Sequence, residues 1–226
     1  MDALPYAAIV LAGGRGARLG GVHKPGLVVG GRSLLERVLA AIPDAAPLVV
    51  VGPPQPVPPG TVLIREEPAG SGPVAALAAG VALLPPEVGQ VAVLAADLPF
   101  LTADVIVTLR AACPFDASPW PTADPVPAAA DPAPGTANPP AGAVLVDSDG
   151  RDQYLAGVWQ AAALRRAIAE FGDPAGGSMR RLLGDLNVVR IGVEVGATAG
   201  SGRPAPWFDC DDPDDLRTAE RWTTST

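Results

Sequence analysis

The segment best suited to bind an anion is rich in glycine and carries three basic side chains. Residues 11–25 read LAGGRGARLGGVHKP, and glycines after an apolar run let backbone amides approach a ligand without Cβ obstruction. Arg15, Arg18 and Lys24 add positive charge there. Lys24 is the only lysine of the chain and follows its only histidine, His23. A lysine ammonium is compact in a way that a guanidinium is not, so this segment is typical of a polyphosphate site.

Three other interpretations of these glycines need to be considered. The segment is not a P-loop, because the Gly-Lys-Ser/Thr ending is missing. Gly14 and Gly16 could belong to a degenerate dinucleotide fingerprint, but the next apolar run ends at Gly52 without the acid that would bind a ribose. A plain turn also remains open, because glycine-rich patterns often occur without a ligand. The position of Lys24 favours phosphate binding.

Carboxylates at two distant points of the sequence are candidate cation ligands. Asp97 follows an apolar run, and ligands of open α/β sheets bind at the carboxyl ends of strands, where a carboxylate can hold Mg²⁺. Asp209 and Asp211 alternate about Cys210, which places both on one side of a predicted late strand. The alternatives are an ordinary strand-to-helix turn for Asp97 and helix N-terminal charge for the later acids.

Apolar runs and amphipathic stretches alternate, which predicts an α/β fold with a doubly wound, mostly parallel, Rossmann-like sheet flanked by helices. Strands are predicted at 6–12, 48–51, 62–64, 91–95, 142–146, 154–159 and 188–193, with a last one ending at 209–211. Helices are predicted at 33–42, 73–84, from 102, at 161–171 and 178–183, and after 212. The capping box Ser33–Glu36 and Pro73 at a first helical position mark two of the starts.

Length and composition limit the class of protein. The 226 residues fit a single domain, interrupted by a Pro/Ala-rich loop at about 114–141 that cannot form a core. A net charge of −8 argues against nucleic-acid and membrane partners. No signal peptide or membrane-crossing run is recognisable, and Cys113 and Cys210 have no metal-ligand spacing. A reduced, cytoplasmic setting is therefore expected.

Taken together, the motifs resemble the nucleotidyltransferase superfamily, and within it the molybdenum cofactor guanylyltransferases. The matching segments follow the order of that family over nearly the whole chain except the Pro/Ala-rich loop; they are residues 11–20, 24–25, 72–77, 97–101, 153–159 and 208–213. The resemblance implies transfer of GMP from GTP to molybdopterin with release of pyrophosphate. It also implies Mg²⁺ as cofactor, and contact with molybdoenzymes or cofactor-insertion proteins.

The resemblance also implies roles for individual residues. Catalysis would rest on Lys24, Arg18 and Asp97, and Mg²⁺ would be held by Asp97 and Asp211. The residues expected to bind the nucleotide are Leu11, Ala12, Gly13, Gly14, Arg15, Gly16, Lys24, Glu67 and Asp97. The residues expected to face the acceptor are Gln153, Tyr154, Ser178 and Arg180.

The chain departs from the family pattern at the base and at the cation site. Gly52 stands where some relatives have Asn near the base, and Asp209 and Asp211 stand where relatives often have Asn. Three rival functions remain: the same chemistry with CTP or with another phosphorylated acceptor, a nucleotide-binding regulator without turnover, and an oxidoreductase. The intact Lys24 and Asp97 argue against the regulator, and the missing acid near Gly52 argues against the oxidoreductase.

Overall fold

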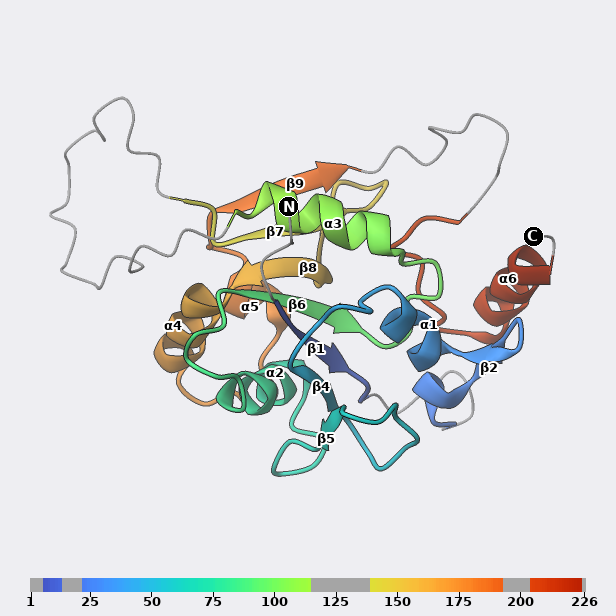
Figure 1. The fold of residues 1–226 in the computed structure, drawn as a ribbon, viewed down its shortest axis with the longest axis horizontal. Coiled ribbons are helices and arrows are strands. Elements are labelled where there is room, and N and C mark those ends of the chain that lie inside the picture. The colour runs from blue at the N-terminus through green and yellow to red at the C-terminus, as the bar shows by residue number, and fades with distance from the viewer. Residues whose placement is uncertain (1–5, 14–21, 115–138, 193–203, 225–226) are drawn as a thin grey trace, which may run out of the picture.

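A seven-stranded sheet forms the centre of the molecule (Figure 1). The structure, a computed structural model, describes residues 6–13, 22–114, 139–192 and 204–224. The strands of the sheet are β1 (Ala7–Leu11), β4 (Leu48–Val51), β5 (Val62–Ile64), β6 (Gln90–Ala95), β7 (Gly142–Val146), β8 (Asp152–Gln160) and β9 (Val188–Gly192). Their spatial order is β5-β4-β1-β6-β8-β7-β9.

The sheet is mostly parallel, as predicted, with β8 as its antiparallel member. β8 pairs antiparallel with both β6 and β7, whereas the pairs of β1 with β4 and β6, β4 with β5, and β7 with β9 are parallel. Only residues 147–151 separate β7 from β8. A parallel pair needs a crossover of a dozen or more residues, so this short connection requires a hairpin.

Helices cover both faces of the sheet (Figure 1), which explains why β1 and β4 are apolar throughout. The helices are η2 (Lys24–Gly26, a 3₁₀ turn), α1 (Leu34–Ala40), α2 (Pro73–Ala82), α3 (Ala103–Ala112), α4 (Ala161–Phe171), α5 (Met179–Leu183) and α6 (Pro213–Thr224). In β1, Ala8 and Val10 pack on the α1 and α3 side, while Ile9 packs on the α2, α4 and α5 side. Every residue of β1 is buried.

The predicted helix starts are confirmed by their hydrogen bonds. Ser33 Oγ accepts from the Glu36 amide, and the Glu36 carboxylate accepts from the Ser33 amide, which completes the capping box. Thr102 and Ser178 cap α3 and α5 through their hydroxyl oxygens. These caps depend only on neighbouring residues, which is why the sequence pattern identified them.

Two features differ from the sequence prediction. Residues 209–211 were predicted to end a strand, but they form an irregular segment that leads into α6. A small hairpin of β2 (Val28–Val29) and β3 (Arg32–Ser33) was not predicted. Most of the Pro/Ala-rich loop, 115–138, lies outside the described residues, so its role and the single-domain organisation remain predictions.

Helix α6 packs beside the β2–β3 hairpin over a separate small cluster of buried side chains (Figure 1). The cluster consists of Val29, Leu34, Phe100, Cys210 and Ala219.

Burial raises the pKa of the Cys210 thiol to about 12, and burial likewise raises the pKa of Cys113 to about 11. Both thiols are therefore uncharged core groups at neutral pH. Among the described residues, no helix has the length and apolar character needed to cross a membrane.

Candidate active site

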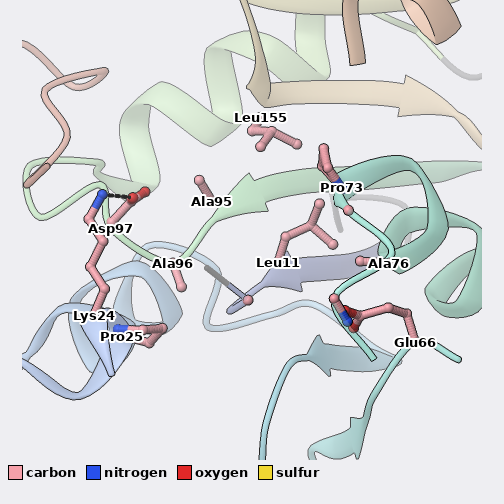
Figure 2. Close-up of a pocket in the computed structure, with 13 residues that line it drawn as sticks. Leu11, Lys24, Pro25, Glu66, Pro73, Ala76, Ala95, Ala96, Asp97 and Leu155 are labelled. Carbon is pink, nitrogen blue, oxygen red and sulfur yellow. Dashed lines mark hydrogen bonds and ion pairs between the residues drawn. The ribbon is translucent and has the colours of Figure 1, made fainter. Parts of the chain in front are cut away.

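A cavity of about 380 Å³ opens where β1 and β6 end (Figure 2). This volume falls within the range of roughly 300–1,000 Å³ common for small-molecule sites. Its lining combines apolar and charged side chains and includes Leu11, Gly13, Lys24, Glu66, Asp97 and Leu155. Leu11, Gly13, Lys24 and Asp97 were predicted to bind nucleotide, so the fold brings these four together.

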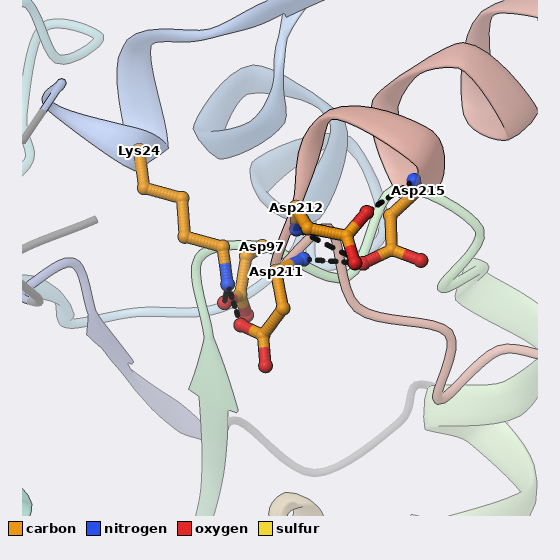
Figure 3. A network of polar contacts seen from close by, with 5 residues as sticks. All are labelled: Lys24, Asp97, Asp211, Asp212 and Asp215. Atoms are coloured by element: carbon orange, nitrogen blue, oxygen red, sulfur yellow. Dashed lines mark hydrogen bonds and ion pairs between the residues drawn. The ribbon is translucent and has the colours of Figure 1, made fainter. Parts of the chain in front are cut away.

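Lys24 bridges two carboxylates at one end of this cavity (Figures 2 and 3). Its Nζ lies 2.5 Å from Asp97 Oδ2 and 2.5 Å from Asp211 Oδ1. The Lys24 side chain is 11% exposed, against 22% for Asp97 and 47% for Asp211. The two carboxylates therefore meet on one ammonium group although 114 residues separate them in the sequence.

The electrostatics of this cluster keep Lys24 charged. Burial by itself lowers the pKa of the Lys24 ammonium, but the Asp97 and Asp211 carboxylates outweigh it, so the pKa lies above its ordinary value. Partial desolvation and the carboxylates of Asp211 and Asp97 raise the pKa of Asp209. In the described part of this cluster, the carboxylates of Asp97, Asp209 and Asp211 outnumber the Lys24 ammonium, which suits the binding of a further cation.

The N-terminus of α6 holds Asp211 in place (Figure 3). Asp215 Oδ2 accepts hydrogen bonds from the amides of Asp211 and Asp212, at 2.9 and 3.0 Å. Asp212 Oδ1 in return accepts from the amides of Asp214 and Asp215. This reciprocal cap, in which Asp212 acts as the predicted N-cap, satisfies helix amides and fixes the backbone of Asp211.

A backbone contact replaces the strand that was predicted at 209–211. The Cys210 amide donates to the Asp97 carbonyl at 3.3 Å, and the rings of Phe208 and Phe100 meet edge to face with centroids 5.7 Å apart. The segment is thereby attached to the turn after β6. Asp211 converges on Asp97 as predicted, but as part of a loop.

The backbone comes unusually close at Gly52, beside the end of β1 that leads into the cavity. A Cβ atom at this position would lie 2.7 Å from the Ala12 carbonyl oxygen and 3.2 Å from the Ala12 Cβ. The amide of Gly52 donates to Ile64, and that of Ala12 to Val51. Ala12 is buried behind the cavity wall. Glycine at position 52 is therefore required by packing against the end of β1.

Gly52→Ala should destabilise the fold by about 1–3 kcal/mol, the usual cost of overpacking a tight site. It should also weaken nucleotide binding, because the displaced Ala12 precedes the cavity residue Gly13. Urea unfolding and nucleotide titration would measure the two effects. Gly192→Ala is the matched control, since a Cβ there meets nothing within 4 Å. Equal stability of both variants would contradict this account of Gly52.

Glu66 is a cavity residue that the sequence prediction missed. It is 8% exposed, and its Oε1 accepts from the Gly70 amide at 2.8 Å. The predicted neighbour Glu67 is exposed and is not among the residues that line the cavity. Ile64 at the end of β5 packs on the α2 side, and continuing the period-two alternation from it would have indicated Glu66. The role of Glu67 remains a prediction.

The four residues predicted to face the acceptor are not among the described residues that line the cavity. Gln153 Nε2 donates to Asp147 Oδ2 at 2.8 Å, and Ser178 caps α5. Tyr154 Oη donates to Asp152. Two hydrogen bonds from Arg190 hold the pKa of the Asp152 carboxylate below its usual value. Arg180 is exposed. Leu155, the residue after Tyr154, does line the cavity. The assignment of the four residues to the acceptor remains a prediction.

Part of the predicted phosphate loop lies outside the described residues, namely Gly14, Arg15, Gly16 and Arg18. The described ends of this loop both line the cavity: a Cβ at Gly13 would meet no atom of the described residues within 4 Å, and Lys24 lies at the other end of the loop. Within the described ranges, no group of three or more His, Cys, Asp or Glu residues is arranged to hold a metal ion.

Known proteins resemble this chain over nearly its full length. The molybdenum cofactor guanylyltransferase of Rhizobium johnstonii is 29% identical over 224 residues, which cover 98% of this chain and 95% of that protein. The enzyme of the same name from Rhodobacter capsulatus is 29% identical over 220 residues, which cover 95% and 94%.

Solved structures share the fold. Molybdopterin-guanine dinucleotide biosynthesis protein A from Archaeoglobus fulgidus superposes with a TM-score of 0.62 at 22% identity, covering 97% of this chain and 100% of that one. The 2-C-methyl-D-erythritol 4-phosphate cytidylyltransferase of Thermus thermophilus gives a TM-score of 0.62 at 22% identity, covering 98% and 100%. Residues 8–190, most of the chain, match the family model described as the MobA-like NTP transferase domain. The chain therefore belongs to the family of MobA-like NTP transferase domains, which makes it a nucleotidyltransferase.

Proposed function

We propose that the chain transfers GMP from GTP to molybdopterin and releases pyrophosphate. The observation that carries this proposal is the bridge of Lys24 between Asp97 and Asp211 at the end of a nucleotide-sized cavity. Relatives of nearly full length are molybdenum cofactor guanylyltransferases, which supports the choice of donor and acceptor. Contact with molybdoenzymes or cofactor-insertion proteins would follow from delivery of the product.

In this reaction a terminal phosphate oxygen of molybdopterin attacks the α-phosphorus of GTP. A new P–O bond forms, the bond to the β-phosphate oxygen breaks, and pyrophosphate leaves with the electron pair. The attacking phosphate is already ionised at neutral pH, so the site needs no general base. The chain contributes alignment and charge neutralisation through Lys24 and, by the sequence prediction, through Arg18 and the loop amides.

Mg²⁺ fits the donor set of the site. Mg²⁺ prefers one or two carboxylates together with phosphate oxygens and water, and Asp97 and Asp211 offer two carboxylates within reach of one group. These residues would hold the ion, which would neutralise charge on the phosphate oxygens. Since the Lys24 ammonium now contacts both carboxylates, we infer that Lys24 moves towards the phosphates when metal and nucleotide bind.

Glu66 favours guanine over cytosine. An ionised carboxylate only accepts hydrogen bonds, and guanine presents two adjacent donors, N1–H and N2–H, on its Watson–Crick edge. Cytosine presents one donor next to an acceptor, which a carboxylate would repel. Glu66 is buried in the cavity wall with one oxygen on the Gly70 amide, so its carboxylate is oriented in advance.

Thermal stabilisation by GTP, CTP, ATP and UTP, each with Mg²⁺, tests the nucleotide assignment. A ligand that binds only the folded state adds about 2.7 kcal/mol of stability at a hundred times its Kd, so GTP should raise Tm most. Glu66→Gln should reduce the preference for GTP. A larger shift with CTP would replace guanylyl by cytidylyl transfer. Pyrophosphate release that depends on added molybdopterin then tests the acceptor.

A further inference from the structure

We propose that the hydrogen bond between His23 and Gln55 is a positioning contact that fixes the Lys24 turn to the loop after β4. The inference rests on the proposed function for its kinetic part, but its structural part can be tested separately. It gives a role to the only histidine of the chain, which is not among the described residues that line the cavity.

The contact joins segments that are distant in sequence. His23 Nε2 lies 2.9 Å from Gln55 Oε1, in a partly buried position. Gln55 Nε2 donates to the Pro53 carbonyl at 3.3 Å, which orients the amide so that its oxygen faces the imidazole. Because Oε1 can only accept, His23 Nε2 carries the proton in this contact.

On one side, the contact controls the backbone that carries Lys24. His23 immediately precedes η2, and its carbonyl accepts from the Gly26 amide at 3.2 Å. A Cβ at Gly26 would lie 3.3 Å from His23 Cδ2, so the imidazole ring lies against this turn. Holding the ring therefore fixes the backbone of Lys24, the first residue of the turn, from which its side chain reaches Asp97 and Asp211.

On the other side, the contact reaches a rigid part of the sheet. The loop of Gln55 begins at Gly52, which packs against the Ala12 backbone and donates to the Ile64 carbonyl. The loop is thus anchored to the ends of β1 and β5. The His23–Gln55 contact therefore attaches the turn that carries Lys24 to the end of β1, which also carries the cavity residue Gly13. Small misplacements of a charged group can lower a rate strongly, so this anchor should affect turnover more than substrate binding.

Kinetics of four variants and one control test the catalytic part. Gln55→Leu and His23→Leu remove the acceptor and the donor, and each should lower kcat roughly 3- to 10-fold, the effect expected of one hydrogen bond, with little change in KM for GTP. His23→Gln should restore most of kcat, because its Nε2 donor can reach the same oxygen. The double variant should be less than additive. Glu170→Gln, which removes the negative charge from a 2.8 Å contact with Arg166 in α4, is the control and should leave kcat unchanged.

NMR of the single lysine tests the structural part without turnover. In protein labelled with [¹⁵N]lysine, one Nζ signal reports on Lys24 alone. Gln55→Leu and His23→Leu should shift or broaden it, whereas His23→Gln and Glu170→Gln should not. Unchanged kcat in both folded leucine variants, or an unchanged Lys24 signal, would overturn the proposal. If wild-type protein transfers no GMP, the proposed function fails, and the Lys24 signal still decides whether the contact positions the lysine.

Discussion

Lys24→Met should lower nucleotidyl transfer by a factor on the order of 100 or more, as expected for the loss of a charge contact made in the transition state. The physical reason is the position of the ammonium, which contacts Asp97 and Asp211 at the cavity. Lys24→Arg should also be impaired, because a planar guanidinium does not occupy the compact position of an ammonium. The measurement is kcat/KM for pyrophosphate release with GTP and acceptor.

The same variant should bind a divalent ion more tightly when nucleotide is absent. In the wild type the ammonium occupies the space between the two carboxylates, whereas in Lys24→Met both are available without competition. Mn²⁺ binding, followed by electron paramagnetic resonance, would show this. Normal turnover of the folded Lys24→Met protein would contradict its catalytic role. Weaker Mn²⁺ binding would contradict the proposed competition.

Some loss of stability should accompany Lys24→Met, because two neighbouring carboxylates lose their cation. Asp211 is nearly half exposed, so solvent screening should keep this loss well below that of a fully buried ion pair. Rates should therefore be compared at a temperature where both proteins are folded, as checked by circular dichroism.

The sequence predicted best those parts of the fold that depend on local patterns. Strands with apolar runs, helices with caps and the position of Asp97 after β6 all follow from neighbouring residues. The unpredicted hairpin of β2 and β3 also carried a local signal. Gly30 and Gly31 form its turn with φ of 55° and 76°, and a Gly-Gly pair is typical of such a turn.

The parts that were predicted less well depend on contacts distant in sequence. Alternation around Cys210 fits a strand and an extended loop equally well. The contact that decides between them, from the Cys210 amide to the Asp97 carbonyl, joins residues that are half the chain length apart. Glu66 and Glu67 are likewise indistinguishable by residue type. The period-two alternation that continues from Ile64 separates them, because it places Glu66 on the side of the cavity.

Asp97→Asn and Asp211→Asn should each weaken metal-dependent transfer, and the first should have the larger effect. Asp97 is the more buried of the two carboxylates and lies just after the end of β6. Its loss should therefore lower the rate by a factor on the order of 100. Asparagine preserves the size of the side chain, which separates the effect of charge from that of packing. The rate should be measured as a function of Mg²⁺ concentration, and half-maximal activity should require more Mg²⁺ in both variants.

The double variant should be less impaired than the product of the two single effects, because residues that act on one ion form a unit. Asp209→Asn is the matched control. Asp209 lies two residues before Asp211, and the charges of Asp97, Asp211 and Lys24 act on its carboxylate. The hydrogen bonds of the Lys24 ammonium, however, go to Asp97 and Asp211. Its loss should therefore leave the Mg²⁺ dependence close to that of the wild type.

A purely structural role for Asp211 makes a different prediction. Its carboxylate would then serve to attach the start of α6 to Lys24, and Asp211→Asn would lower Tm without altering the Mg²⁺ dependence. The Asp211 amide already donates to the Asp215 carboxylate, and the Cys210 amide donates to the Asp97 carbonyl. The segment therefore keeps two backbone hydrogen bonds without the Asp211 carboxylate. We therefore expect a small change in Tm and a clear change in Mg²⁺ dependence, and the reverse result would remove Asp211 from the metal site.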